Sequence, residues 1–574
     1  MRLTRSPLLD DSLPVWRARL VLGLLMVGFL ALVGRSLYLQ GINKDFYIGK
    51  GESRYERVIE MPATRGRILD RHGDVLAIST PVKSVWAIPE DAKLTPAQTR
   101  ELATLLDLDS REISRKLAAD RDFTYLKRQI APDVAERIAT LKLPGIHFQN
   151  EYRRYYPAGD ATAHMLGFTG NEDMGQEGIE LALNSQLVGK PGSRRVIKDR
   201  RGQIVEDVES IRVPQEGKDV ILALDAKLQY VAFSQLKNAI ADHKAKAGGI
   251  VILDAKSGEV LALANLPAYN PNNRKNLSGA QLRNRAFTDT FEPGSTFKPF
   301  AVALALDKGN VRADTAIQTA PGKLTIGTAT ISDAHPHGVL SVAQVIQKSS
   351  NIGTAKMALA LPSEEMWKMF DQLGFGQPLK LGFPGEAGGR LRPWKRWRPI
   401  EQATMSYGHG ISVTLIQLAR AYQAFARNGD LVPLTLTRTD VVPAVGARVF
   451  SEQTAREMRA MLELAVQPGG TAPKAQVPGY RVAGKTGTAN KLEGGVYANK
   501  YVSSFVGFAP ASDPRLIVAV MIDEPSAGGY YGGTVAAPVF SNVMGNALRA
   551  LGVPPDDTPK PLQVANISPA KEEM

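Results

Sequence analysis

A serine and a lysine whose spacing suits nucleophilic catalysis lie at Ser295 and Lys298, just before the apolar run Phe300–Leu306. Residues three apart share one face of a helix, so a helix beginning here would place the hydroxyl beside the amine. An adjacent base is what turns a serine into a nucleophile. The pattern alone is weak, because a second copy, Ser568–Lys571, occurs in a Pro-rich tail. The interpretation therefore depends on the residues that accompany Ser295.

Two further motifs follow in the chain. Ser349 and Asn351 flank a short break between the helical patterns 342–346 and 352–361, where side chains can point into a cleft. Lys485–Thr488 reads Lys-Thr-Gly-Thr on a strand-like stretch, and its glycine lets a ligand approach the backbone. The order Ser-x-x-Lys, Ser-x-Asn, Lys-Thr-Gly is the signature of the penicillin-binding and serine β-lactamase group. The three motifs together predict acyl transfer through Ser295.

Composition excludes several other kinds of chemistry. The chain has no cysteine, which rules out disulfides, thiolate catalysis and cysteine-ligated metals. His335 and His337 flank a proline, but no third ligand is evident, so we expect neither a metal nor a cofactor. Lysine and arginine number 70 against 57 acidic residues, a net charge of +13. No dense basic run is interleaved with aromatics, so we expect no nucleic-acid binding; the charge equally suits an anionic polymer or a membrane.

The N-terminal region predicts a membrane anchor. Residues 1–19 are polar, residues 20–34 are an uninterrupted apolar run, and the run continues through Arg35 to residue 39. Twenty residues suffice to cross a bilayer if Arg35 extends to the interface. No small-residue cleavage site follows, which favours a retained anchor over a removed signal peptide. Lysines and arginines tie on the two sides, so their count leaves the orientation open.

The rest of the chain, at 574 residues long enough for two or more domains, divides near residue 218. Residues 50–217 are mixed α/β without catalytic spacing, as expected of a structural or docking domain, and residues 554–574 have the composition of a disordered tail. Helices are predicted at 101–117, 133–141 and 226–241, and strands at 220–224, 249–254, 259–263, 501–508 and 515–522. The predicted fold class is α+β.

Longer stretches resemble the class B penicillin-binding proteins, in particular their proteobacterial cell-division branch, over nearly the whole chain. The stretches that resemble the family's pedestal domain are Arg65–Arg71, Arg153–Pro157, Gly178–Glu180 and Lys198–Gly202. Those that resemble its catalytic domain, besides the three motifs, are Tyr269–Asn272, Tyr407–Gly410 and Asp523–Pro525. The resemblance implies a cytoplasmic tail (1–19), an inner-membrane anchor (20–39), a pedestal or dimerisation-type domain (50–217) and a periplasmic transpeptidase domain (218–553), an antiparallel sheet flanked by helices.

The resemblance also implies a reaction. Ser295 would attack the carbonyl of a D-Ala-D-Ala stem peptide, D-alanine would leave, and an amine of a second strand would resolve the acyl-enzyme; β-lactams would acylate the same serine. Lys298 must be neutral to accept the serine proton, so its pKa must fall by about 3 units from about 10.4. Burial and a nearby cation, Lys485, would both lower it. Ser349 would relay the proton to the leaving amine.

The binding roles follow from the same resemblance. Asn351 would hydrogen-bond the acyl-side amide, and the backbone N–H groups of Ser295 and Thr488 would form the oxyanion hole. Thr486 and Thr488, on either side of Gly487, would hold the terminal carboxylate beside Lys485. Strict strand alternation places Lys485 and Thr486 on opposite faces. A twist or a bulge must reconcile them, or their roles differ from those in the family.

Several alternatives to a septal transpeptidase stay open. An elongation-type transpeptidase or a catalytically idle division scaffold would share much of the sequence, although an idle site need not keep all three motifs. A class A β-lactamase is disfavoured, because no glutamate between Glu364 and Glu463 has an asparagine four residues on. A bifunctional synthase is disfavoured because residues 50–215 carry no glycosyltransferase motif. The partners implied are peptidoglycan stem peptides, β-lactams, the inner membrane and division proteins such as FtsW.

Overall fold

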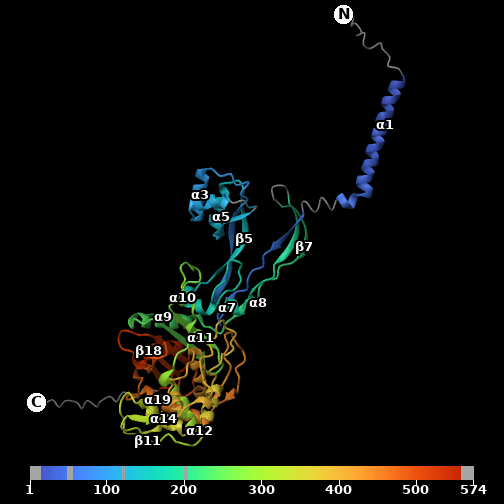
Figure 1. Ribbon diagram of the computed structural model, residues 1–574. Coiled ribbons are helices and arrows are strands. Elements are labelled where there is room, and N and C mark those ends of the chain that lie inside the picture. Colours follow the sequence, from blue (N-terminus) through green and yellow to red (C-terminus); the bar gives the residue numbers. More distant parts are fainter. Residues whose placement is uncertain (1–14, 48–55, 119–120, 122, 199–203, 558–574) are drawn as a thin grey trace, which may run out of the picture. The chain divides into compact units, whose positions relative to one another are not determined.

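The computed structural model describes residues 15–47, 56–118, 121, 123–198 and 204–557. The sequence forms two compact units, residues 1–63 with 189–216, and residues 64–188 with 217–574 (Figure 1). Most of the predicted cytoplasmic tail, most of the stretch 198–202 and most of the predicted disordered tail lie outside the described residues.

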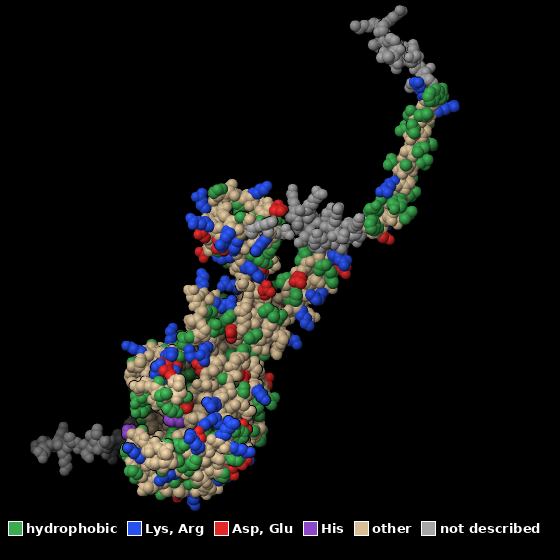
Figure 2. Space-filling model, in the orientation of Figure 1, with side chains coloured by type: hydrophobic (Ala, Val, Ile, Leu, Met, Phe, Trp, Pro, Cys, Tyr) green, Lys and Arg blue, Asp and Glu red, His purple; other side chains and the backbone are tan. Residues whose placement is uncertain are grey.

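The first unit begins with an exposed apolar helix, α1 (Val15–Leu37), which continues as a π-helical turn at Tyr38–Ile42. Figure 2 shows hydrophobic side chains along nearly all of its length, and its side chains are exposed. The helix with its turn is long and apolar enough to span a membrane. It contains the whole predicted anchor and starts five residues before it. The guanidinium carbon of Arg35 lies 5.5 Å from the centre of the Tyr38 ring.

The same unit contains a three-stranded antiparallel sheet in the order β1-β6-β7. Its strands are β1 (Glu56–Met61), β6 (Gly192–Lys198) and β7 (Ile204–Arg212). The register between β6 and β7 shifts at three points, which marks bulges along this pair.

The second unit begins with a mixed α/β segment. Its strands are β2 (Ile68–Leu69), β3 (Val75–Ala87), β4 (Thr124–Ile130), β5 (Ile146–Tyr155) and β8 (Val220–Ile221), and its longer helices are α3 (Pro96–Leu106), α4 (Ser110–Leu117) and α5 (Pro132–Thr140). The single helix predicted at 101–117 is wrong. Asp107 adopts a left-handed conformation that ends α3, and the Asp109 side chain accepts from the backbone N–H of Arg111 to begin α4. The strand predicted at 220–224 is only two residues long.

A buried ion triad joins three of the stretches that resemble the pedestal. The Glu180 carboxylate accepts hydrogen bonds from Arg65 Nε and Arg154 Nε, each at 2.7 Å, and all three side chains are at most 1% exposed. Glu180 lies on the short helix α7 (Gly178–Ala182). Because two guanidinium groups share one carboxylate, removing that carboxylate leaves two buried charges unpaired.

We therefore expect Glu180→Ala to lower the free energy of unfolding by about 3–5 kcal/mol. The measurement is urea unfolding followed by circular dichroism. Glu172→Ala is the matched control, because Glu172 is 82% exposed and contacts Arg128 only at 3.9 Å. A loss for Glu180→Ala no larger than for this control would show that the triad contributes nothing measurable.

The catalytic part of the second unit is built on a five-stranded antiparallel sheet in the order β10-β9-β19-β18-β17. The strands are β9 (Ala247–Asp254), β10 (Val260–Leu266), β17 (Ala483–Glu493), β18 (Val496–Ala509) and β19 (Leu516–Asp523). The predicted hairpin of 249–254 with 259–263 and both predicted closing strands are confirmed. The strand with the Lys-Thr-Gly motif, β17, lies at the free edge of the sheet.

Helices cover both faces of this sheet, so it is buried on both sides (Figure 1). Ile250, Ile252 and Val520 belong to a core shared with α9 (Ala226–Asp242) and α21 (Ala537–Ala550). The alternate residues Val251 and Leu253 belong to a core shared with α12 (Lys298–Asp307) and α17 (Leu415–Ala421). Burial on both faces explains why β9 is apolar along its whole length rather than alternating. The predicted α+β class is confirmed.

Candidate active site

Ser295 lies on a 3₁₀ turn, η4 (Gly294–Phe297), and the α-helix α12 begins only at Lys298. The predicted helix start at this stretch is thus confirmed with one change, since the serine precedes the α-helix. Gly294 takes a φ of +56°, and Gly408 takes a φ of +84° directly against it. A Cβ at Gly408 would lie 2.3 Å from the carbonyl oxygen of Gly294. Only glycine at position 408 therefore lets this loop seat the Ser295 turn.

The Lys298 amine contacts the serine hydroxyls of two motifs. Its Nζ donates to Ser295 Oγ at 2.6 Å, to Ser349 Oγ at 3.1 Å and to the Ser349 carbonyl oxygen at 2.9 Å. Lys298 is fully buried, whereas Ser295 is partly exposed. A partly exposed hydroxyl within hydrogen-bond distance of a buried amine is the arrangement a nucleophile and its base require.

Ser349 connects the two lysines of the site. It has a left-handed backbone (φ 61°) between α13 (Val342–Lys348) and α14 (Asn351–Leu359), which confirms the predicted break between two helices. Its Oγ accepts from Lys485 Nζ at 2.9 Å as well as from Lys298 Nζ. A continuous path of polar atoms therefore runs from Ser295 Oγ through Lys298 and Ser349 to Lys485.

Burial makes both lysines poor cations. The pKa of Lys298 is well below its usual value, chiefly because the side chain is buried and secondly because the charge of Lys485 repels its own. The nearby carboxylate of Asp333 raises this pKa and so opposes part of the shift. Burial also lowers the pKa of Lys485 to about 7. The two effects expected for Lys298, burial and the nearby cation, are both present. A lysine held neutral near neutral pH can accept a proton from a hydroxyl.

These shifts predict a pH dependence of stability. Unfolded Lys485 titrates near its ordinary pKa of 10.5, whereas the folded group titrates near 7. Between these values the unfolded chain binds more protons than the folded one, so the free energy of unfolding rises with pH, by up to about 1.4 kcal/mol per pH unit for each such lysine. Urea unfolding at pH 7, 8 and 9 should show a shallower rise for Lys485→Met than for wild type.

The exposed lysine Lys368 supplies the control for this experiment. Its side chain is 61% exposed and pairs with Glu364 on the same helix. Lys368→Met should keep the wild-type dependence on pH. Equal slopes for wild type and Lys485→Met would contradict a depressed pKa at Lys485.

The structure of β17 shows how Lys485 and Thr486 come close together although they lie on opposite faces of the strand. The pairing with β18 is regular from Ala483 to Asn490, and the register shifts only after Asn490, so no bulge intervenes within the motif. Lys485 pairs with Val506 and Thr486 with Phe505, which belong to the two different cores. The Lys485 Nζ nevertheless lies 3.3 Å from Thr486 Oγ1. The reach of the lysine side chain brings the two groups together.

The two threonine hydroxyls also have partners beyond the strand. Thr486 Oγ1 bonds Thr471 Oγ1 at 3.0 Å, and Thr488 Oγ1 accepts from the backbone N–H of Gly532 at 3.0 Å. Gly532 begins the short helix α20 (Gly532–Val535). Gly487 lies against the Ser295 turn, since a Cβ there would be 2.7 Å from the Pro293 carbonyl oxygen. The role of these threonines in holding a carboxylate stays a prediction.

Asp333 is a site residue that the sequence analysis missed. Its Oδ2 accepts from Ser350 Oγ at 2.7 Å, and its Oδ1 accepts from the backbone N–H of Ile352 at 3.0 Å. The preceding residue, Ser332, accepts from Asn351 Nδ2 at 2.8 Å through its carbonyl oxygen. Asp333 thus caps α14 and fixes the corner that presents Ser349 and Asn351. No local pattern in the sequence marks an aspartate 17 residues before its partner.

Tyr407 and His409 form another part of the site that the sequence analysis named only through resemblance. The Lys298 Nζ lies 5.9 Å from the centre of the Tyr407 ring. The pKa of His409 falls to about 4 because of burial and, second, the charge of Lys298. A cavity of about 340 Å³ adjoins this region and is lined by residues that include Glu292 and Lys491. Burial raises the pKa of Glu292, which accepts from Tyr497 Oη at 3.2 Å.

Among the residues that the structure describes, no group of three or more histidine, aspartate or glutamate side chains could hold a metal ion.

The fold and the three motifs define a serine acyl-transfer domain of the penicillin-binding type. The family model for the penicillin-binding protein transpeptidase domain matches residues 248–545, and that for the penicillin-binding protein dimerisation domain matches residues 60–222. The chain belongs to the penicillin-binding proteins that combine these two domains.

Particular relatives cover almost the whole chain. It is 46% identical over 557 residues to the probable peptidoglycan D,D-transpeptidase PenA of Neisseria gonorrhoeae, covering 96% of this chain and 95% of that protein. It is 42% identical over 549 residues to the peptidoglycan D,D-transpeptidase FtsI of Escherichia coli K12, covering 94% and 93%. The solved transpeptidase domain of Burkholderia pseudomallei penicillin-binding protein 3 matches with a TM-score of 0.55 and 52% identity, covering 59% of this chain and 98% of that domain.

Proposed function

We propose that this chain is a serine-type peptidoglycan D,D-transpeptidase that cross-links stem peptides through an acyl-enzyme at Ser295. The observation that carries the proposal is the 2.6 Å contact between Ser295 Oγ and the buried Lys298 amine, whose pKa is depressed. The near-full-length relatives named as peptidoglycan D,D-transpeptidases support the choice of substrate.

The reaction has two acyl transfers. Neutral Lys298 takes the proton of Ser295 as Oγ attacks the carbonyl of the penultimate D-alanine, and the C–N bond to the last D-alanine breaks. The leaving nitrogen receives a proton through Ser349, which contacts both lysines. The amine of a second stem peptide then attacks the ester, an amide forms, and the serine regains its proton. No net oxidation and no cofactor are required.

The edge strand β17 supplies the place for the substrate. An extended peptide can add to a free sheet edge through backbone hydrogen bonds. The terminal carboxylate would lie near Lys485, Thr486 and Thr488, and Asn351 would hydrogen-bond the acyl-side amide. The backbone N–H groups of Ser295 and Thr488 would form the oxyanion hole, where loss of one donor typically costs about 3 kcal/mol of transition-state stabilisation. The close approach of Gly294 to the Thr488 carbonyl oxygen supports this pairing of segments.

The cellular role we propose is septal, with α1 as an inner-membrane anchor, the bulk of the chain in the periplasm, and the lipid-II polymerase FtsW as a partner. The name of the FtsI relative and the exposed apolar helix support this role. Depletion of the protein in its host distinguishes the septal role from a role in cell elongation. Filaments without septa are expected, whereas rounded cells would indicate elongation.

The biochemical test uses the full chain in detergent micelles with a pentapeptide donor that ends in D-Ala-D-Ala and an amine acceptor. Mass spectrometry should detect the peptide dimer together with released D-alanine. Release of D-alanine without a dimer would indicate a hydrolase. If folded protein gives neither product, the chain would instead be a catalytically idle scaffold.

A further inference from the structure

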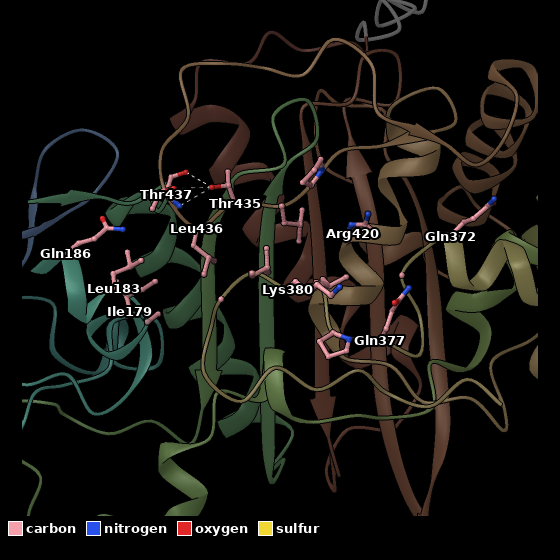
Figure 3. Close-up of a pocket in the computed structure, with 18 of the residues that line it drawn as sticks. Ile179, Leu183, Gln186, Gln372, Gln377, Lys380, Arg420, Thr435, Leu436 and Thr437 are labelled. Atoms are coloured by element: carbon pink, nitrogen blue, oxygen red, sulfur yellow. Dashed lines mark hydrogen bonds between the residues drawn. The ribbon is translucent and has the colours of Figure 1, made fainter. Parts of the chain in front are cut away.

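A second cavity has a volume of about 660 Å³ (Figure 3). Three segments line it: the α7 region with Ile179 and Leu183, the loop 371–382 after α15 (Ser363–Gln372), and the stretch 433–437. Arg420 of α17 completes the lining. The three motifs do not contribute to it. Its volume is in the range of sites that bind small molecules.

Arg420 is a half-buried cation that forms no ion pair with any residue the structure describes. Its Nη1 donates to the carbonyl oxygen of Leu373 at 3.0 Å, at the end of α15, and this is the hydrogen bond that the described residues provide. Burial lowers its pKa with no acidic group to oppose the change, whereas Glu463 raises the pKa of Arg481. Gly374 makes room for the guanidinium, since a Cβ there would lie 2.8 Å from Nη1. The Nε and Nη2 groups have no acceptor among the described residues.

The other groups in the cavity suit an anion with an apolar body. Lys380 also lines the cavity and forms no ion pair among the described residues. Asp371 is the acidic residue of the lining, and among the described residues its carboxylate accepts a side-chain hydrogen bond only from Gln377 Nε2, at 3.5 Å. Figure 3 shows Lys380, Gln377 and Arg420 on one side and Ile179, Leu183 and Gln186 on the other, with Leu436 between them. A guanidinium with free N–H groups binds carboxylate or phosphate strongly. The leucine wall, which we define as the lining residues Leu183, Leu379, Leu381, Leu434 and Leu436, would cover apolar carbon.

Residues next to the walls of this cavity contact the Ser295 turn. Two residues after Arg420, the buried Tyr422 donates its hydroxyl to the carbonyl oxygen of Thr296 at 2.8 Å. Next to the other wall, Phe370 near the end of α15 and Phe375 in the segment that follows it pack on Phe297, with ring centres 4.8 and 4.7 Å away. Both walls of the cavity therefore have neighbours that contact one of the two residues after Ser295, Thr296 or Phe297. A ligand that shifts either wall would shift the nucleophile.

We propose that this cavity is a regulatory site for a small amphipathic anion, whose carboxylate or phosphate binds Arg420 and Lys380 and whose apolar part lies on the leucine wall. Occupancy changes the rate at which Ser295 is acylated. Binding of the anion does not depend on the proposed function, whereas the effect of the bound anion on acylation rests on the proposed function.

Binding is tested on the full chain in detergent micelles after Ser295 has been blocked with benzylpenicillin, so that the catalytic site cannot contribute. The probes are N-acetyl-leucine for a peptide carboxylate and benzyl phosphate for a phosphate, followed by isothermal titration calorimetry. Arg420→Gln should weaken the preferred probe about tenfold or more, the loss of a hydrogen bond to a charged group. Lys380→Gln should also weaken binding of the preferred probe. Because Lys380 is exposed, this loss of affinity cannot be attributed to misfolding.

Lys368→Gln is the control, since it removes one exposed positive charge from α15 without lining the cavity. Unchanged affinity in this variant, with weaker binding in the other two, supports the site, and the better probe identifies the source of the anion. Equal affinity in all variants, or no binding of either probe, overturns it.

The coupling is measured on unblocked protein as the rate of labelling by a fluorescent penicillin, with and without a saturating probe. We expect a change of about fivefold or more in wild type, the lower range of allosteric coupling, and none in Arg420→Gln. Binding without a change in rate would overturn the regulatory role and leave the proposed function intact. No labelling of wild type at all would instead overturn the proposed function.

Discussion

Ser295→Ala is expected to abolish covalent labelling by a fluorescent penicillin and to stop release of D-alanine from a D-Ala-D-Ala peptide. The substitution removes the atom that forms the acyl bond, and loss of a serine nucleophile typically lowers kcat by about 10⁶-fold. The side chain is partly exposed, and its contact with Lys298 Nζ is the hydrogen bond it loses. The free energy of unfolding should therefore stay near that of wild type. Gel fluorescence and urea unfolding measure the two quantities.

The chain provides its own control for this prediction. Ser568 begins the second Ser-x-x-Lys copy, so Ser568→Ala changes the same short pattern in another place. This variant should be labelled like wild type. Labelling that survives in Ser295→Ala would show that another residue is acylated, and labelling lost in both variants would point to a defect unrelated to the nucleophile.

Lys298→Met is expected to lower the rate of acylation by about 10²–10⁴-fold, the usual contribution of a general base, while the nucleophile stays in place. The methionine fills a similar volume but cannot accept a proton. In wild type the rate should rise with pH as Lys298 loses its proton, and this rise should disappear in the variant. The measurement is the rate constant of labelling from pH 5 to 9.

The same variant should be at least as stable as wild type. Lys298 is fully buried and its folded pKa is depressed, so near neutral pH the unfolded chain binds more protons there and the lysine destabilises the fold. Lys308→Met serves as a control, because Lys308 is 45% exposed and pairs with Glu365. A rate for Lys298→Met within a few-fold of wild type, with an unchanged pH profile, would assign the base elsewhere.

The parts of the fold and the site that the sequence predicts are those encoded by short-range patterns. The hairpin of β9 and β10 follows from two apolar runs around a glycine turn, and the break at Ser349 follows from two helical patterns that stop and restart. The depressed pKa of Lys298 could also be predicted, because it requires only burial and a second lysine. The first two conclusions depend on residue types within a few positions of one another, whereas the third also depends on Lys485, which is distant in the chain.

The features that the sequence did not predict depend on contacts between distant segments. Asp333 caps α14 from the residue after the strand β13 (Ala329–Ser332), so its role exists only once both elements are in place. The edge position of β17 depends on the order of the strands in the sheet, which cannot be read from the strand itself. The break at Asp107 is a local event, yet the amphipathic pattern continues across it. The cavity at Arg420 likewise arises from three separate segments.

The most direct test of the central claim is intact-protein and peptide mass spectrometry of the full chain after brief exposure to benzylpenicillin, followed over hours after the excess is removed. We predict one adduct per chain, on the peptide that contains Ser295, with little loss over that time. An adduct on another residue, no adduct on folded protein, or its rapid loss to water would contradict an acyl-enzyme at Ser295 that is kept for transfer to an amine.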